Sequence, residues 1–143
     1  MPDLLTVNYA QSGKSTRQNG MGMREMQARA YAARTAQYLL LKAPPASGKS
    51  RALMFLALDK VIKQGLKKVI VAVPEMSIGG SFRDTNLTDF GFFADWHVDC
   101  DLCTAGNEGK VEQVVAFLNN TESRYLLCTH ATLRFAYERM GDP

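Results

Sequence analysis

Gly48, Lys49 and Ser50 together have the chemistry to bind phosphate groups. They follow an apolar run at residues 38–42 and a proline-containing turn, and a long helical pattern begins at Lys49. In that order, backbone N–H groups of the turn can point at phosphate oxygens, and the helix adds the positive end of its dipole. Gly48 lets the main chain approach the ligand, Lys49 can reach the outer phosphates, and the Ser50 hydroxyl can ligate Mg²⁺. The sequence therefore predicts a binding site for a nucleoside triphosphate with its magnesium ion.

The predicted nucleotide-binding loop extends from the end of the strand into the first turn of the helix. Its residues are Ala43, Pro44, Pro45, Ala46, Ser47, Gly48, Lys49, Ser50 and Arg51. The general pattern of such loops has a glycine at position 43, so an accidental Gly-Lys-Ser at a strand–turn–helix join is the alternative. An upstream copy of the tripeptide at residues 13–15 is followed by loop chemistry rather than by a helix. We therefore assign residues 1–22 to a flexible, polar lead-in.

The composition of the 143-residue chain is typical of one soluble globular domain. Its hydrophobic share is 46% and its charged share is 22%. No apolar run approaches the roughly 20 residues that cross a bilayer, and no secretory signal peptide is visible. We therefore expect a cytoplasmic protein without a membrane partner. The net charge of +3 permits an acidic partner without requiring one.

The three cysteines do not predict a disulfide framework, because their number is odd. Cys100 and Cys103 have the spacing of metal ligands, and Cys128 and His130 would complete a set of four. Cys128 lies inside an apolar strand pattern, however, where a buried thiol that acts as a small hydrophobic side chain is the commoner case. A metal site is therefore the minor alternative.

Strand and helix patterns alternate along the chain. The strand patterns lie at residues 38–42, 68–73, 97–103 and 124–129, and the helical patterns at 23–37, 49–64, 77–84, 110–118 and 133–140. Residues 68–73 are apolar without alternation, which is typical of a strand buried on both faces. This order predicts an α/β fold with a parallel sheet and flanking helices. The aromatic segment 86–96 is predicted to pack against the domain rather than to stack on a ligand.

These segments, in this order, resemble the first motor domain of superfamily 2 helicases and translocases. The likeness is greatest to the DEAD/DEAH-box group of type III restriction enzyme Res subunits, whose loop reads Ala, four residues, then Gly-Lys-Thr/Ser, as residues 43–50 do. The resemblance implies a RecA-like P-loop NTPase domain over residues 23–143, with ATP and Mg²⁺ as cofactors. It also implies that Lys49 is the catalytic lysine and that Ser50 contacts the nucleotide-bound Mg²⁺. In the full-length protein, ATP hydrolysis would drive movement on nucleic acid, most simply DNA.

A further match gives Gln27 a role. Residues 23–27 resemble the Leu-Arg-Pro-Tyr-Gln segment that reads adenine in this group. The physical basis is that a glutamine amide offers one donor and one acceptor, which pair with adenine N6 and N7. The alternative is that Gln27 is a polar residue on an exposed helix face.

Two other matches concern nucleic acid. Ser77 follows the strand at 68–73, where the family places its first nucleic-acid-contacting motif, and Thr129 and His130 follow the strand at 124–129, where the next such motif lies. Ligands of open α/β sheets gather at the carboxyl ends of strands, which supports both placements. The alternative for Thr129 is that it caps the following helix.

One family motif is missing from the sequence. No apolar run ends in the Asp-Glu pair that holds Mg²⁺ through water and prepares the attacking water. We therefore expect an incomplete motor domain that hydrolyses ATP no faster than background, with a second motor domain elsewhere in a longer protein. Exposed sheet edges would favour self-association. Two other functions stay open: a P-loop phosphotransferase of a small substrate, and a non-catalytic protein-binding module.

Overall fold

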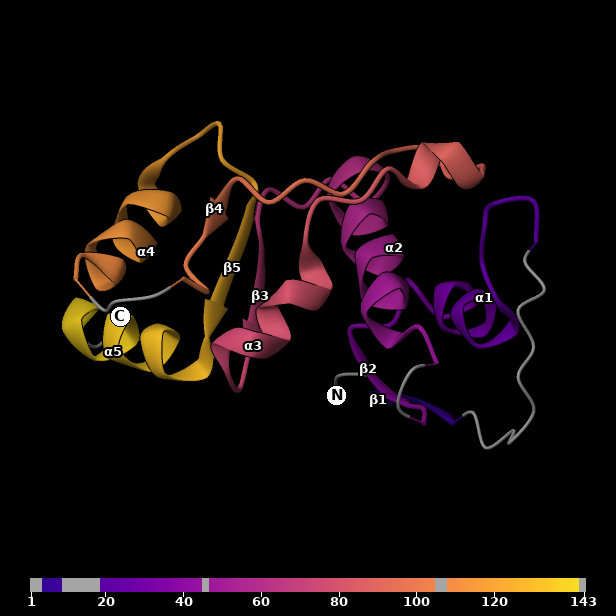
Figure 1. Ribbon diagram of the computed structural model, residues 1–143, viewed down its shortest axis with the longest axis horizontal. Helices are drawn as coiled ribbons and strands as arrows, with labels where there is room; N and C mark the ends of the chain where they lie inside the picture. Colours follow the sequence, from indigo (N-terminus) through magenta and orange to yellow (C-terminus); the bar gives the residue numbers. More distant parts are fainter. Residues whose placement is uncertain (1–3, 9–18, 45–46, 105–107, 142–143) are drawn as a thin grey trace. The chain divides into compact units, whose positions relative to one another are not determined.

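A computed structural model describes residues 4–8, 19–44, 47–104 and 108–141, with the backbone alone at 4–8 (Figure 1). Length predicted one domain, but the chain divides into two compact units. Unit 1 comprises Met1–Gln64 and Asn86–Trp96, and unit 2 comprises Gly65–Thr85 and His97–Pro143. None of the helices in the described ranges is long and apolar enough to cross a membrane.

Unit 1 contains a two-stranded parallel sheet and two main helices. Its elements are β1 (Leu4–Asn8), α1 (Glu25–Ala32), β2 (Tyr38–Lys42), α2 (Lys49–Ile62) and the 3-10 helix η2 (Leu87–Phe90). In the sheet, Leu4 lies opposite Tyr38 and Asn8 opposite Lys42. Residues 4–8 are therefore strand, within the segment 1–22 that the sequence analysis assigned to a flexible, polar lead-in. The reason is that β1 pairs with a strand far along the chain, and such a partner leaves no local signal.

Helices α1 and α2 pack through small side chains. Ala30 of α1 and Ala52 of α2 are fully buried and share an apolar cluster with Met26. Alanine at both positions lets the two helix backbones approach closely, since neither helix presents a long side chain there. Helix α1 ends at Ala32, where the sequence predicted a helix over 23–37.

A buried carboxylate links the C-terminal ends of these helices. Asp59 of α2 is 2% exposed. It accepts hydrogen bonds from the Tyr31 hydroxyl at 2.7 Å and from Gln64 Nε2 at 2.8 Å, and Arg34 Nε lies 3.7 Å away. Because a buried charge is costly unless it is paired and hydrogen-bonded, these contacts fix the geometry at this end of unit 1. Burial and the Asp59 hydrogen bond raise the pKa of Tyr31 to about 12.

The aromatic segment 86–96 packs into unit 1, as the sequence predicted. The ring centroid of Phe92 lies 4.7 Å from that of Phe55 in α2 and 5.9 Å from that of Tyr31 in α1. Trp96 is 1% exposed. Phe92 and Trp96 therefore contribute to the core between the two helices, whereas Phe90 of the same segment is 49% exposed.

Unit 2 contains a three-stranded parallel sheet with helices. Its elements are β3 (Val69–Val73), α3 (Met76–Gly79), the 3-10 helix η1 (Gly80–Phe82), β4 (Cys100–Asp101), α4 (Lys110–Asn119), β5 (Tyr125–Thr129) and α5 (His130–Met140). The strand order is β3-β5-β4. The predicted α/β class with parallel strands and helices is confirmed, but the strands of the described ranges form two sheets rather than one. Strand β4 is shorter than the predicted 97–103, and helix α3 stops before the predicted end at 84.

The central strand of unit 2 is β5 rather than the segment at 68–73. Residues 125–128 are buried, whereas Ile70 of β3 is 38% exposed. Strand β3 lies at an edge and has one neighbour, so continuous apolarity predicted more burial for it than the structure shows. Helices α4 and α5 pack together beside the sheet (Figure 1). The apolar cluster between them comprises Leu102, Val114, Phe117, Leu126, Cys128 and Ala136.

Cys128 is a core side chain. It is fully buried in β5, and burial raises the pKa of its thiol to about 11. Within the described ranges, no three His, Cys, Asp or Glu side chains are placed to hold a metal ion. The alternative of a Cys100–Cys103–Cys128–His130 metal site therefore has no support, and the interpretation of Cys128 as a buried hydrophobic residue is confirmed.

The pKa of Tyr31 yields a test of the contact with Asp59. A phenol whose pKa is raised in the folded state contributes stability that is complete below pH 10 and is lost as pH rises through 12. Tyr31→Phe should therefore lower the free energy of unfolding by about 1.5–3 kcal/mol near neutral pH, the range for a hydrogen bond to a charged group. Denaturant unfolding at several pH values, followed by circular dichroism, measures this difference.

Between pH 10 and 12 the stability of the parent chain should fall toward that of Tyr31→Phe. The matched control is Tyr137→Phe, since Tyr137 is 58% exposed on α5. A constant gap between parent and Tyr31→Phe over that pH range would show that the Asp59 contact does not hold the phenol neutral.

Candidate functional site

The turn between β2 and α2 ends in a glycine of left-handed conformation, from which α2 begins. Gly48 is the N-cap of α2 and has φ +91°. A side chain at this position would be strained, because a positive φ is costly for residues with a Cβ. The carbonyl oxygen of Gly48 accepts the N–H of Ala52 at 3.1 Å, which starts the helix. The N-terminal N–H groups of α2 are thereby directed out of the helix end, and its first turn contains no acidic residue.

Gln27 holds this turn in place from α1. Its Nε2 donates to the Gly48 carbonyl at 3.0 Å, and its Oε1 accepts the Arg24 N–H at 2.8 Å. Gln27 is 2% exposed, so the alternative of an exposed polar residue is wrong. A Cβ at Gly48 would lie 2.4 Å from Gln27 Nε2, which shows how closely the amide approaches the loop. Each polar atom of the amide keeps further capacity, one N–H and one lone pair, beyond these two bonds.

The remaining residues of the predicted loop differ in their exposure. Lys49 is exposed, and Ser50 is half-buried in the first turn of α2. The Ser47 hydroxyl is buried and has no hydrogen-bond partner among the described residues. An orphaned buried hydroxyl is unusual and is relieved when a ligand supplies the missing partner. Ala43 and Pro44 connect β2 to the turn, whereas Pro45 and Ala46 lie outside the described residues.

Two arginines lie near the loop. Arg51, predicted as a nucleotide-binding residue, has its guanidinium carbon 5.3 Å from the centre of the Phe90 ring. Arg24 was not predicted: its Nη1 lies 3.9 Å from the position that a Cβ would take at Gly48. The sequence signal that could have found it is its spacing: Arg24 stands three residues before Gln27, at the start of α1. A guanidinium here adds positive charge beside a site suited to phosphate.

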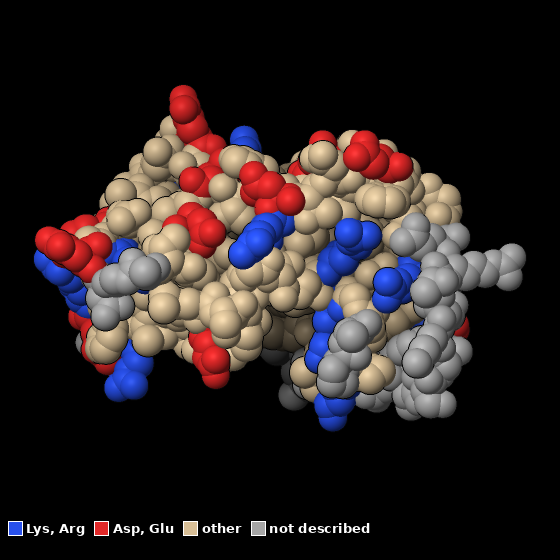
Figure 2. Space-filling model, viewed as in Figure 1, with Lys and Arg blue, Asp and Glu red and all other residues tan. Residues whose placement is uncertain are grey.

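Unit 1 as a whole is basic. It holds ten of the 17 Lys and Arg residues but only five of the 14 Asp and Glu residues. On the face drawn in Figure 2, the basic side chains of unit 1 lie close together, whereas its acidic side chains lie at one end. A net positive unit attracts polyanions such as a nucleoside triphosphate.

The predicted nucleic-acid residues lie in unit 2, at the carboxyl ends of β3 and β5. Thr129 is the N-cap of α5: its Oγ1 accepts the Thr132 N–H at 3.2 Å and donates to Thr132 Oγ1 at 3.1 Å. The capping alternative is therefore confirmed. His130 Nε2 lies 3.2 Å from the Ala72 carbonyl, to which it donates, and so joins α5 to β3. Ser77 is exposed, and its Oγ lies 3.4 Å from Glu75 Oε2.

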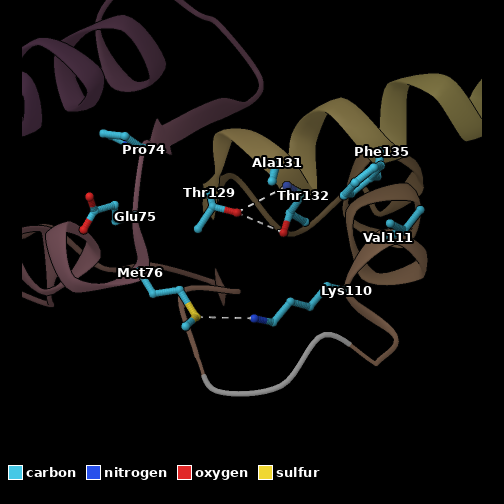
Figure 3. A pocket seen from close by; sticks show the side chains of 9 residues that line it. All are labelled: Pro74, Glu75, Met76, Lys110, Val111, Thr129, Ala131, Thr132 and Phe135. Atoms are coloured by element: carbon cyan, nitrogen blue, oxygen red, sulfur yellow. Dashed lines mark hydrogen bonds between the residues drawn. The ribbon is translucent and has the colours of Figure 1, made fainter.

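A pocket lies beside Thr129, and its most unusual side chain was not predicted. Lys110, the first residue of α4, is 7% exposed and extends across the pocket toward Met76 (Figure 3). The sequence analysis missed Lys110 because a lysine at the start of an amphipathic helix normally faces solvent. Only the fold shows that α4 begins against the ends of β3 and β5.

The chain is similar to part of a larger curated protein. It is 56% identical over 144 residues to a Bacillus subtilis (strain 168) protein described as "Putative ATP-dependent helicase YeeB". The match covers 99% of this chain and 24% of that protein, so the chain spans about a quarter of the relative's length. No protein-family model and no solved structure matches the chain.

The geometry of Gly48 can be tested against a matched glycine. Gly48→Ala should lower the free energy of unfolding by more than the about 1–2 kcal/mol expected for alanine at positive φ, because the new Cβ also displaces Gln27. Gly65→Ala supplies the reference, since Gly65 has φ +79° and nothing within 4 Å of a Cβ. Urea unfolding of both variants measures the difference.

In a Gln27→Ala background the extra cost of Gly48→Ala should shrink to the value at Gly65, because the two positions are in direct contact. Equal costs for Gly48→Ala and Gly65→Ala in the parent chain would show that Gln27 does not press on the loop.

Proposed function

We propose that this chain is the ATP-binding part of a superfamily 2 helicase or translocase of the restriction-enzyme type. The observation that carries the proposal is the positive-φ Gly48 at the head of α2, held by the buried Gln27 amide. The similarity to a quarter of a protein named as an ATP-dependent helicase supports it. In the full-length protein, the energy of ATP hydrolysis would be coupled to movement on nucleic acid, with DNA as the proposed substrate.

Each residue of the loop has a proposed role toward MgATP. Lys49 neutralises charge on the β- and γ-phosphates, and Ser50 offers its hydroxyl to the magnesium ion. The Ser47 hydroxyl and the N–H groups at the start of α2 donate to phosphate oxygens. Magnesium, when bound with the nucleotide, supplies charge neutralisation between the phosphates. The orphaned Ser47 hydroxyl and the absence of acid in the first turn of α2 fit such an anionic ligand.

Gln27 is proposed to serve two purposes. Its two hydrogen bonds join the start of α1 to the loop, and the unused N–H and lone pair of the amide are available to the edge of adenine. Adenine recognition would then be linked mechanically to the phosphate loop. In unit 2, Ser77, Thr129 and His130 are the proposed contacts to the nucleic-acid backbone.

Nucleotide binding at this loop can be tested with a matched pair of lysines. Lys49→Ala should weaken MgATP binding at least about tenfold, a loss of about 1.4 kcal/mol, because the only loop lysine is removed. Lys14→Ala is the control, since Lys14 stands in the other Gly-Lys-Ser of the sequence. Titration with a fluorescent ATP analogue gives both affinities. Equal weakening by the two substitutions would exclude the predicted site.

Hydrolysis is a separate expectation. The 143-residue sequence contains no strand pattern that ends in Asp-Glu, so this chain alone should hydrolyse ATP at the background rate. A phosphate-release assay with and without single-stranded DNA measures the rate. Turnover that disappears in Lys49→Ala would contradict the expectation and would mean that another acidic residue supports the chemistry.

A further inference from the structure

The pocket of unit 2 is formed where α3, α4, β5 and α5 meet beside the end of β3. It has a volume of about 450 Å³ and lies at the carboxyl ends of β3 and β5, beside the start of α4. Its lining residues are Pro74, Glu75, Met76, Lys110, Val111, Thr129, Ala131, Thr132 and Phe135. This edge of a parallel sheet is the usual position of ligands in open α/β folds.

Lys110 is a buried cation for which the described part of the chain supplies no carboxylate partner. Its Nζ donates to the Thr104 carbonyl and lies 3.8 Å from Met76 Sδ, a weak acceptor. No ion pair of the described residues includes Lys110. Burying an ammonium group is costly unless an opposite charge compensates it. An anion in the pocket would supply that charge and accept the N–H hydrogen bond that the Met76 sulfur accepts only weakly.

The surroundings of Lys110 limit the charge of this anion. Glu75 lines the same pocket and lies at its exposed rim. One lysine and one nearby glutamate favour a ligand with a single negative charge, because each further charge would meet the glutamate. A phosphodiester carries one charge, whereas a nucleoside triphosphate carries several.

The other walls of the pocket are apolar. Met76, Val111 and Phe135 line it together with Pro74, and Phe135 is 57% exposed on α5 (Figure 3). An exposed aromatic ring beside a cation is the combination that binds single-stranded nucleic acid, where the base stacks and the phosphate pairs. The Thr129 hydroxyl is already used twice by the helix cap, so Lys110 is the better phosphate ligand.

We propose that this pocket binds one nucleotide unit of a single strand, with the phosphodiester at Lys110 and the base against Phe135. The inference rests on the proposed function, because it names the residues of unit 2 that grip the nucleic acid. It moves the principal contact from the Thr129 side chain, which the sequence predicted, to the buried lysine of α4.

The experiment measures binding of a short, fluorescein-labelled oligothymidylate by anisotropy at several salt concentrations. Lys110→Met, which keeps the apolar stem, should weaken binding about tenfold and reduce the slope of log affinity against log salt by about 0.7, the value for one lost phosphate contact on a single strand. Phe135→Ala should weaken binding and leave the slope unchanged. Lys67→Met, which removes an exposed lysine of unit 2, is the control and should change neither quantity.

An unchanged affinity and slope in Lys110→Met would overturn the proposal, as would equal competition by duplex DNA or by inorganic phosphate. Because a buried position is changed, a second measurement uses the parent chain: ultraviolet cross-linking to an oligonucleotide that contains 5-iodouracil. The cross-linked peptide should include Phe135, and cross-links confined to other segments would overturn the base contact.

MgATP binding in the same variants separates this inference from the proposed function. Lys110→Met should bind the fluorescent ATP analogue as the parent chain does, and Lys49→Ala should bind the oligothymidylate as the parent does. If the parent chain does not bind the ATP analogue, the proposed nucleotide site is refuted, and the oligothymidylate measurements still decide the pocket. Intact ATP binding with no effect of Lys110→Met would refute the pocket alone.

Discussion

The hydrogen bond from the Gln27 amide to the Gly48 carbonyl is the contact on which the candidate nucleotide site depends. It joins the first turn of α1 to the loop that precedes α2, and both partners are largely shielded from water. A hydrogen bond in such a setting is costly to break, because either group would be left unsatisfied. The positive φ of Gly48 then turns the chain sharply into α2, so that the helix N-terminus and its unpaired N–H groups are presented together. The interaction therefore fixes Gly48 relative to α1 before any ligand arrives, which would reduce the ordering cost of binding.

The rest of unit 1 supports this contact from the opposite ends of the same two helices. Ala30 and Ala52 bring α1 and α2 close together, and Asp59 ties their C-terminal ends through Tyr31 and Arg34. Any change in the angle between the helices would strain the Gln27 contact as well as the Asp59 contacts. The segment 86–96 fills the remaining space with Phe92 and Trp96, so residues distant in sequence stabilise the helices that hold the loop.

The pocket of unit 2 is distinguished by a buried charged side chain, Lys110, rather than by a glycine turn. Lys110 is the first residue of α4, and the packing of α4 against α5 carries its ammonium group under the end of the sheet. The Thr129 hydroxyl caps α5, and His130 donates to the Ala72 carbonyl of β3. Lys110 is therefore the side chain of this pocket whose charge the described residues do not compensate. The two proposed anion-binding sites thus belong to separate units, the loop before α2 to unit 1 and the pocket at Lys110 to unit 2.

The sequence by itself determined the features that depend on neighbouring residues. The start of α2 at Lys49, the strand at 38–42 and the helix at 110–118 follow from turn residues and hydrophobic period, which are local properties. The division into two sheets, the pairing of β1 with β2, the edge position of β3 and the burial of Lys110 were decided by the tertiary structure alone. Each of these features depends on contact between two segments that are far apart along the chain. The local residue pattern of one segment does not specify which other segment it will contact. Gln27 belongs partly to each group. The sequence motif predicted a functional role for it, but only the tertiary structure shows that its amide donates a hydrogen bond to the Gly48 carbonyl.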